Sequence, residues 1–186
     1  QCLLLRRFED DFKQYHHACE CHLATLAGMT DLGDSLQSVD GLITELQDFD
    51  VKTKGDVERA ETLHASGERF IEEDHYAVDC IRPKCIELQR ICQQYKDLLR
   101  QRYELLNKSR ELQERIDKAN KWCTRGVDLV ATQSIERYSS LGGAETALQE
   151  VELFLSEVQS LRLHNPKEFR SQFDLVMSQE TKAAVH

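Results

Sequence analysis

The stretch that decides the fold runs from Asp79 to Gln133 and reads DCIRPKCIELQRICQQYKDLLRQRYELLNKSRELQERIDKANKWCTRGVDLVATQ. Its only proline, Pro83, stands near the start, where a helix tolerates one. Apolar or small residues recur at intervals of three and four along both halves: Ile81, Cys85, Leu88, Cys92, Tyr95 and Leu99, then Leu112, Ile116, Ala119, Cys123, Gly126 and Val130. This spacing predicts one helix of about 50 residues, roughly 75 Å long. Such a helix indicates a coiled coil or a helical repeat and not a compact enzyme core.

The composition of the 186-residue chain favours long solvated helices over a sheet, because 31% of the residues are charged and only two are proline. The net charge of −9 argues against a surface for duplex nucleic acid and gives no support to charge-driven lipid binding. No apolar run approaches the ~18 to 20 residues of a membrane span. Leu5 is followed at once by Arg6 and Arg7, which excludes a signal-peptide core. We therefore expect no direct membrane insertion and no nucleic-acid partner.

The residues before this stretch supply its packing partners. Apolar spacing predicts a first helix over residues 2–28 and a second over 36–70, although the polar run 50–58 could interrupt the second with a coil. Together with the first half of the long helix, these make three antiparallel segments of similar length. The sequence therefore predicts a first three-helix bundle over residues 1–108.

The chain then repeats itself. A gap at residues 139–143 precedes a predicted helix over 144–163, and the apolar pattern of the second helix recurs there 112 residues later: Leu36, Val39, Leu42, Ile43 and Leu46 become Leu148, Val151, Phe154, Leu155 and Val158. The second half of the long helix thus opens a second bundle over 109–186, and one continuous helix joins the two bundles.

The second bundle is predicted to be incomplete. The sequence His164-Asn165-Pro166 ends its second helix, and only a short apolar segment at 167–177 and a helix start at 178–181 follow. A full third helix would need many more residues. We expect apolar surface that a partner covers or that stays poorly ordered.

A three-helix unit of about 110 residues that shares a helix with the next unit resembles a spectrin repeat. Trp122 stands where that family places its first-helix tryptophan; the first bundle has Cys19 or a neighbour there and lacks the third-helix tryptophan near Cys92. The segments Trp122–Gln133, Gly143–Leu155, Asn165–Phe173 and Glu180–Ala183 resemble a repeat in Rho guanine nucleotide exchange factors of the Dbl group. The resemblance covers residues 75–186 in detail and the first 75 as a generic repeat.

The resemblance implies a non-catalytic scaffold or interaction region that spaces, localises or autoinhibits an exchange domain. Implied partners are other proteins or the exchange domain itself, with a Rho-family GTPase engaged only through the parent protein. A cytoplasmic location is implied, with recruitment to membrane or cytoskeleton by other domains. Since the chain ends in mid-pattern at His186, we expect a fragment of a larger protein. The alternative is a cytoskeletal or adaptor spectrin-repeat protein that acts through homodimerisation or helical partner binding.

The best candidate for a metal site is the cluster of His16, His17, Cys19, Cys21 and His22. On a helix, His22 has Cys19 three residues back but an alanine four residues back, so only one of these neighbours could be a ligand. A tetrahedral zinc site needs four converging ligands. We expect instead a core thiol beside surface histidines.

The other candidates also favour structural roles. Cys80 and Cys85 are five residues apart, so they do not face each other on a helix. Residues 72–75 (Glu72, Glu73, Asp74 and His75) resemble a solvated turn more than an acid–base pair. Trp122 is expected in the core and not as an exposed hot spot. The sequence therefore predicts no catalytic, cofactor-binding or metal-binding residues and no cofactor.

The seven cysteines favour a reduced, cytosolic setting. Four of them lie on the apolar stripes, where a free thiol behaves as a small hydrophobe: Cys19, Cys85, Cys92 and Cys123.

Overall fold

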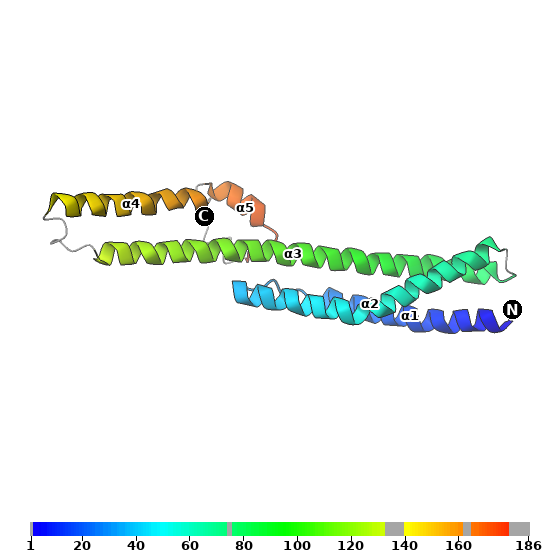
Figure 1. Ribbon diagram of the computed structural model, residues 1–186. Coiled ribbons are helices and arrows are strands. Elements are labelled where there is room, and N and C mark those ends of the chain that lie inside the picture. Colours follow the sequence, from blue (N-terminus) through cyan, green and yellow to red (C-terminus); the bar gives the residue numbers. More distant parts are fainter. Residues whose placement is uncertain (1, 74–75, 133–139, 162–164, 179–186) are drawn as a thin grey trace. The chain divides into compact units, whose positions relative to one another are not determined.

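The computed structural model describes residues 2–73, 76–132, 140–161 and 165–178, and all of its regular elements are α-helices (Figure 1). They are α1 (Cys2–Gly28), α2 (Leu36–Glu72), α3 (Val78–Thr132), α4 (Leu141–Leu161) and α5 (Pro166–Phe173). The predicted all-α class is confirmed. None of the described helices combines the length and apolarity needed to cross a membrane.

The long helix predicted from residue 79 to 133 is confirmed as α3, with each end displaced by one residue. Pro83 lies in its second turn and does not end it. The polar patch 107–110 is also helical. Ser109 inside the patch is buried, and so are the stripe residues Leu106 and Leu112 on either side of the patch.

The helix α2 continues through the polar run 50–58, where the sequence allowed a coil. Thr53, Val57 and Ala60 are buried there at a spacing of four and three. This packing outweighs the low helix propensity of Gly55, which costs only about 1 kcal/mol relative to alanine.

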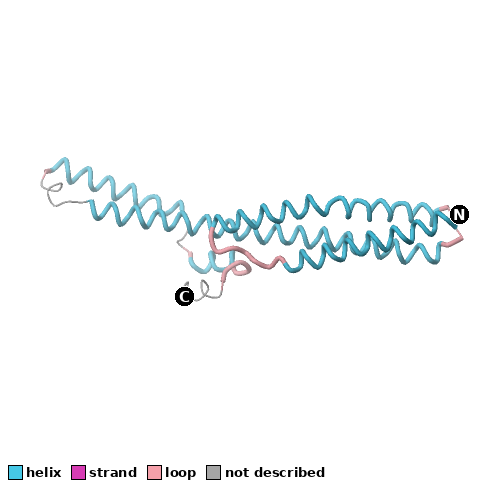
Figure 2. The backbone as a smooth tube through the Cα atoms, turned by 90° about the horizontal axis from the view of Figure 1, so that it is seen from below, coloured by secondary structure: helices cyan, strands magenta, loops and turns pink. Residues whose placement is uncertain are grey.

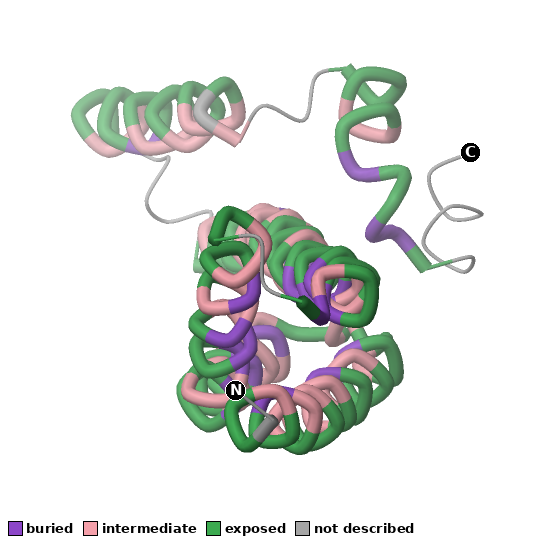
Figure 3. Tube along the Cα trace, turned by 90° about the vertical axis from the view of Figure 1, so that its right-hand side faces the viewer, coloured by how far each residue is buried: buried purple, intermediate pink, exposed green. Residues whose placement is uncertain are grey.

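The chain divides into two compact units, and the first comprises residues Gln1–Leu32 and Gly41–Leu106. In this unit 1, α1, α2 and the first part of α3 lie side by side, with α2 antiparallel to the other two (Figures 1 and 2). The Phe8 ring meets Phe70 edge-on with centroids 6.2 Å apart, and Lys84 binds Glu9 at 3.2 Å. Figure 3 shows the buried positions along the inner sides of these helices. The three helices therefore pack around one shared apolar core.

Gly67 allows α2 and α3 to approach closely in unit 1. A Cβ atom at this position would lie 2.2 Å from the Cys85 sulfur and 3.1 Å from the Phe8 ring. The absence of a side chain at Gly67 is therefore a requirement of the core.

The second unit comprises residues Gly33–Asp40 and Asn107–His186. In this unit 2, α4 lies alongside the second part of α3 (Figures 1 and 2). The helix α4 begins at Leu141, so the prediction that residues 141–143 are a gap was wrong. The Ser140 Oγ accepts a hydrogen bond from the Gly143 amide at 3.1 Å, and this N-cap starts the helix before the two glycines.

The short apolar segment predicted at 167–177 contains α5, whose start is capped by Asn165 through a 3.2 Å bond from the Glu168 amide. The helix start predicted at 178–181 lies almost wholly outside the described residues. The domain boundary predicted between residues 108 and 109 stays a prediction.

Candidate interaction surface

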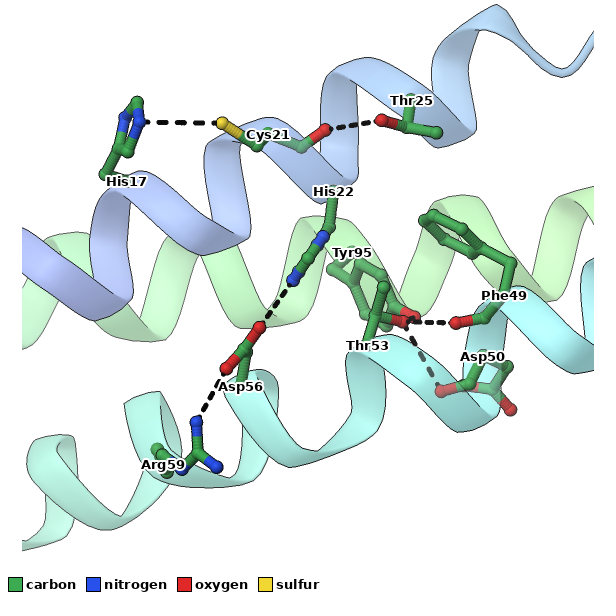
Figure 4. Close-up of polar contacts among 10 residues, drawn as sticks. All are labelled: His17, Cys21, His22, Thr25, Phe49, Asp50, Thr53, Asp56, Arg59 and Tyr95. Carbon is green, nitrogen blue, oxygen red and sulfur yellow. Dashed lines mark hydrogen bonds and ion pairs between the residues drawn. The ribbon is translucent and has the colours of Figure 1, made fainter.

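Of the candidate metal cluster, His17 and Cys21 face each other whereas His22 points towards Asp56 on α2 (Figure 4). His22 Nε2 lies 2.9 Å from Asp56 Oδ2 on α2, whereas His16 Nε2 lies 3.0 Å from Glu87 Oε1 on α3. His17 Nε2 lies 3.7 Å from the sulfur of its exposed neighbour Cys21. Across the described part of the chain, no three His, Cys, Asp or Glu side chains form a group that could hold a metal ion. The histidines instead tie α1 to both of its neighbours.

Cys19 of the same cluster is fully buried, as predicted for a core thiol. Cys85 and Cys92 are buried too, and burial raises the pKa of the Cys85 thiol to about 11. Cys123 is exposed, although it lies on the predicted apolar stripe. The stripe that holds Cys123 was read correctly as apolar, but no described helix covers it. Cys80 is exposed while Cys85 is buried, which fits the prediction that they do not face each other.

Two buried hydroxyl groups inside unit 1 are hydrogen-bonded. Tyr95 and Thr53, both buried, share a 2.6 Å hydrogen bond, and the Thr53 hydroxyl also lies 2.9 Å from the Phe49 carbonyl (Figure 4). Burial raises the pKa of Tyr95. A bond of this kind favours one register of α2 against α3, because a shifted helix would separate the two buried hydroxyls.

Arg102 was missed by the sequence analysis. Its side chain is only 7% exposed and donates from Nη2 to the Asp31 carbonyl oxygen, so it holds the loop after α1 against α3. Burial lowers the pKa of this guanidinium. Its position three residues after Leu99 and four before Leu106, on the apolar stripe, was the available signal.

In unit 2, Trp122 packs against α4. Its ring stacks on Phe154 with centroids 4.4 Å apart, and its Nε1 donates to the Phe154 carbonyl oxygen at 3.1 Å. Trp122 is half-buried, and Gly126 makes room for the Phe154 ring, since a Cβ there would lie 2.6 Å from it. Trp122 therefore lies between α3 and α4 and holds the two helices together.

The ion pair of Arg125 with Glu157 marks one side of the helix pair. Each helix turns about 100° per residue, so Arg125 lies about 60° from Trp122 around α3, and Glu157 lies about 60° from Phe154 around α4 in the same sense. Because α3 and α4 are antiparallel, an equal rotation about each helix axis, starting from the facing residues Trp122 and Phe154, leads to the same side of the helix pair. The ion pair of Arg125 with Glu157 confirms that these two residues lie on the same side.

The opposite side of the same helix pair is apolar and exposed. Rotation by about 80 to 140° the other way reaches Cys123, Val127 and Val130 on α3, and Leu155 and Leu148 on α4. Val127 is 69% exposed, Val130 73%, Leu148 59% and Leu155 56%. We call these five residues the open apolar face. Figure 3 shows that α4 is mostly exposed or half-buried.

The short helix α5 packs on α3 at another level of unit 2. Phe173 is fully buried, with Lys108 Nζ 4.8 Å and the Arg115 guanidinium 5.2 Å from its ring centre. The Gln172 amide links Glu111 at 2.9 Å and Arg115 at 3.1 Å. These contacts hold α5 beside residues 108–115 of α3. The open apolar face begins further along α3, at Cys123, so no element among the described residues covers it.

The turn predicted at 72–75 is only partly described. Glu72 is the last residue of α2 and Glu73 follows it in a turn. Asp74 and His75 lie outside the described residues.

These features define a class: an all-helical chain in which one long helix serves two successive units, as in spectrin-like arrays. Comparison with known proteins is consistent with it. The family model described as "Guanine nucleotide exchange factor DBS-like, spectrin-like" matches residues 133–186. No solved structure matches the chain.

Curated relatives match almost the whole chain. The human guanine nucleotide exchange factor DBS is 38% identical over 180 residues, which is 97% of this chain and 16% of that protein. The rat DBS protein is 36% identical over the same shares, and the human proto-oncogene DBL is 26% identical over 98% of this chain and 20% of its own length. The chain is thus similar to guanine nucleotide exchange factors of the Dbl group over almost its whole length, and its C-terminal part matches their spectrin-like model, which confirms the predicted resemblance. The matched stretch includes most of the first 75 residues, for which only a generic repeat was predicted.

Proposed function

We propose that this chain is a non-catalytic helical region of a Rho guanine nucleotide exchange factor, and that its open apolar face receives a helix from elsewhere in the longer protein. The relatives that match it are exchange factors, and the family model that matches it is spectrin-like. The observation that carries the proposal is the open apolar face itself. Exposed apolar area of this kind marks an interaction site.

The internal repeat favours a helix as the occupant. Ile43 of α2 corresponds to Leu155 of α4, and Ile43 packs against the core of unit 1, to which α1 and α3 both contribute. The position in unit 1 that corresponds to Leu155 is therefore covered by neighbouring helices. Burying a leucine side chain contributes about 1.5–3 kcal/mol, so covering Leu148 and Leu155 would be favourable. The relatives supply ample chain for this, since this sequence spans 16% of the length of DBS.

Such docking can restrain the exchange domain. A restraint requires that the region contacts the exchange domain, or the helix leading to it, more strongly in the inactive state than in the active one. If the helix leading to the exchange domain docked on the open apolar face in the inactive state only, this contact would provide the required difference between the two states. A region that only spaces or localises the exchange domain does not require contacts that differ between the inactive and active states.

Nucleotide exchange measurements on a Rho-family GTPase test the restraint. We expect the longer protein to exchange faster when residues 1–186 are deleted, and also when Leu148 and Leu155 are both changed to glutamate. The matched control is Leu153→Glu, since Leu153 is 66% exposed but lies on the side of the ion pair. Equal rates for the intact protein, the deletion and the double variant would contradict the restraint.

The alternative is permanent homodimerisation through the same face. It predicts that the longer protein is a dimer and that the double variant is a monomer. Polar substitution of Phe169 and Phe173, suggested by their apolar pattern, is a poor test, because Phe173 is fully buried against α3. Leu148 and Leu155 are the appropriate positions.

We further propose that residues 1–108 fold independently of 109–186, and that the parent protein works in the cytoplasm through protein partners. The internal core of unit 1, which holds three helices, supports the first part. A cooperative thermal transition of the isolated 1–108 segment tests it, and a segment that does not fold would contradict it.

A further inference from the structure

Two acidic side chains flank the open apolar face on α4. Glu145 stands three residues before Leu148, and Glu152 stands three residues before Leu155. Residues at this spacing are neighbours on the surface of a helix. Both glutamates are exposed, and neither has an ion-pair partner among the described residues. They are seven residues apart, as the two leucines are, so the acids follow the same edge of α4 over about two turns.

The α3 edge of the same face carries no charge among the described residues. Arg125 is engaged with Glu157 on the opposite side of the helix pair. Lys121 is engaged with Asp117 on its own helix, at 2.7 Å. The described residues that neighbour the face on α3, three or four positions from its members, are small or uncharged: Ala119, Asn120, Thr124, Gly126 and Ala131. The described rim of the open apolar face is therefore acidic and has no cation to balance it.

The earlier copy of the apolar pattern, at the start of α2, contains the corresponding acid with its partner. Asp40 precedes Glu152 by 112 residues, which is the shift that relates the two copies. It stands four residues after Leu36, as Glu152 stands four residues after Leu148. Arg110 of α3 donates from its Nε to Asp40 Oδ1 at 2.6 Å, and both residues belong to unit 2. A basic side chain on the next helix along the chain therefore binds the acid that corresponds to Glu152.

We propose, on the basis of the proposed function, that the helix received by the open apolar face carries basic side chains along one flank of its apolar stripe. Two of them, about two turns apart, meet Glu145 and Glu152. The exposed Leu148 and Leu155 require an apolar stripe on any occupant, and the two carboxylates select among amphipathic helices. Charges at the rim of an interface act mainly in this way, on partner choice and on the association rate.

A second copy of this chain is a poorer occupant of the face than a basic helix. Pairing two copies through the face would bring Glu145 and Glu152 of both to one interface, without a described cation at either rim. Like charges at an interface oppose association. The repulsion weakens self-association through the face without preventing it, because the apolar contact remains.

Two synthetic amphipathic peptides test the proposal in titrations with the folded 186-residue chain, followed by fluorescence anisotropy. Both have the same leucine stripe at spacings of three and four. One carries arginine at two flanking positions seven residues apart, and the other carries glutamate there. The chain is kept dilute so that self-association does not compete. We expect the arginine peptide to bind about five- to thirtyfold more tightly, with a preference that shrinks as the salt concentration rises.

Reversing the charges on the chain should reverse the preference between the peptides. We expect the variant with both Glu145→Lys and Glu152→Lys to bind the glutamate peptide more tightly than the arginine peptide. The matched control for Glu152→Lys alone, which should reduce the preference, is Asp128→Lys, which should keep it. Asp128 is also exposed, but it lies three residues after Arg125, on the side of the ion pair.

The measurement separates the basic flank from the helix-binding role on which it rests. If neither peptide bound the wild-type chain, the open apolar face would not receive a helix, and both proposals would fail. If both peptides bound equally, or if charge reversal left their order unchanged, the basic flank alone would be overturned. Binding of the arginine peptide that survived Leu148→Glu combined with Leu155→Glu would place the contact elsewhere and would also overturn it.

Discussion

At the scale of single residues, unit 1 combines an apolar core with a few fixed polar contacts. Thr53 and Tyr95 share a hydrogen bond inside the core, and Glu87 binds His16 from the neighbouring helix. Apolar contacts tolerate sliding of one helix along another. Each of these hydrogen bonds, by contrast, joins two particular side chains and forms only when the helices are in one register. The polar contacts therefore select the register in which the apolar stripes pack.

Replacing Tyr95 with phenylalanine should lower the free energy of unfolding by about 0.5–1.5 kcal/mol, because the buried Thr53 hydroxyl loses a partner. Chemical denaturation monitored by circular dichroism measures this. The matched control is Tyr103→Phe, since Tyr103 is half-buried and has no hydroxyl partner among the described residues. Equal losses for the two variants would contradict a specific role for the Thr53–Tyr95 bond.

Glu87 should make unit 1 sensitive to acid. Its hydrogen bonds from Arg90 and His16 lower the pKa of its carboxyl group to about 2. A carboxyl whose pKa is lower in the folded state stabilises the fold above its unfolded pKa of about 4.3, and this stabilisation is lost as the pH falls towards 2.

The Glu87→Gln variant tests this linkage. It should be less stable than the wild type at pH 7, and the difference should shrink as the pH falls from about 5 towards 2. Urea denaturation at several pH values measures it. Glu104→Gln is the control, because Glu104 is exposed and has no ion-pair partner among the described residues. A stability difference for Glu87→Gln that does not change with pH would argue against the assignment.

At the scale of helices, the apolar periodicity was the most informative feature of the sequence. It predicted α3 to within a residue at each end, since every turn of that helix places a stripe residue where a neighbour can cover it. The boundaries of α4 were less predictable, because Ser140 caps the helix ahead of two glycines that suggested a loop. The continuity of α2 past Gly55 depended on burial of Thr53, Val57 and Ala60, which propensity does not report.

Gly126→Ala should disturb the pairing of α3 with α4. The added Cβ would lie 2.6 Å from the Phe154 ring, and overpacking of this kind costs typically about 1–3 kcal/mol. The near-ultraviolet circular dichroism of Trp122, the only tryptophan in the chain, reports the stack directly and should weaken.

The control for this substitution is Gly142→Ala in α4. None of the described residues lies within 4 Å of a Cβ at Gly142, and alanine favours the helix there by up to about 1 kcal/mol. This variant should be as stable as the wild type or more so. A Gly126→Ala protein that keeps both its stability and its tryptophan signal would contradict the described packing.

At the scale of the whole molecule, the sequence predicted that an apolar surface would remain because a third helix is missing from unit 2. It did not predict which residues form that surface. Cys123 was predicted to lie on an apolar stripe, and the structure leaves it exposed with Val127 and Val130. The choice between the two sides of the helix pair depends on Trp122 and Arg125, whose partners on α4 no single-sequence pattern identifies.

The isolated chain should therefore associate with itself through the open apolar face when no other helix covers it. Sedimentation equilibrium over a wide concentration range measures this most directly. We predict that the mass of the wild-type chain rises above 21.5 kDa with concentration, that Leu148→Glu combined with Leu155→Glu remains at 21.5 kDa, and that Leu153→Glu behaves like the wild type. A wild-type chain that remains at 21.5 kDa at every concentration would contradict the claim that this face receives a helix.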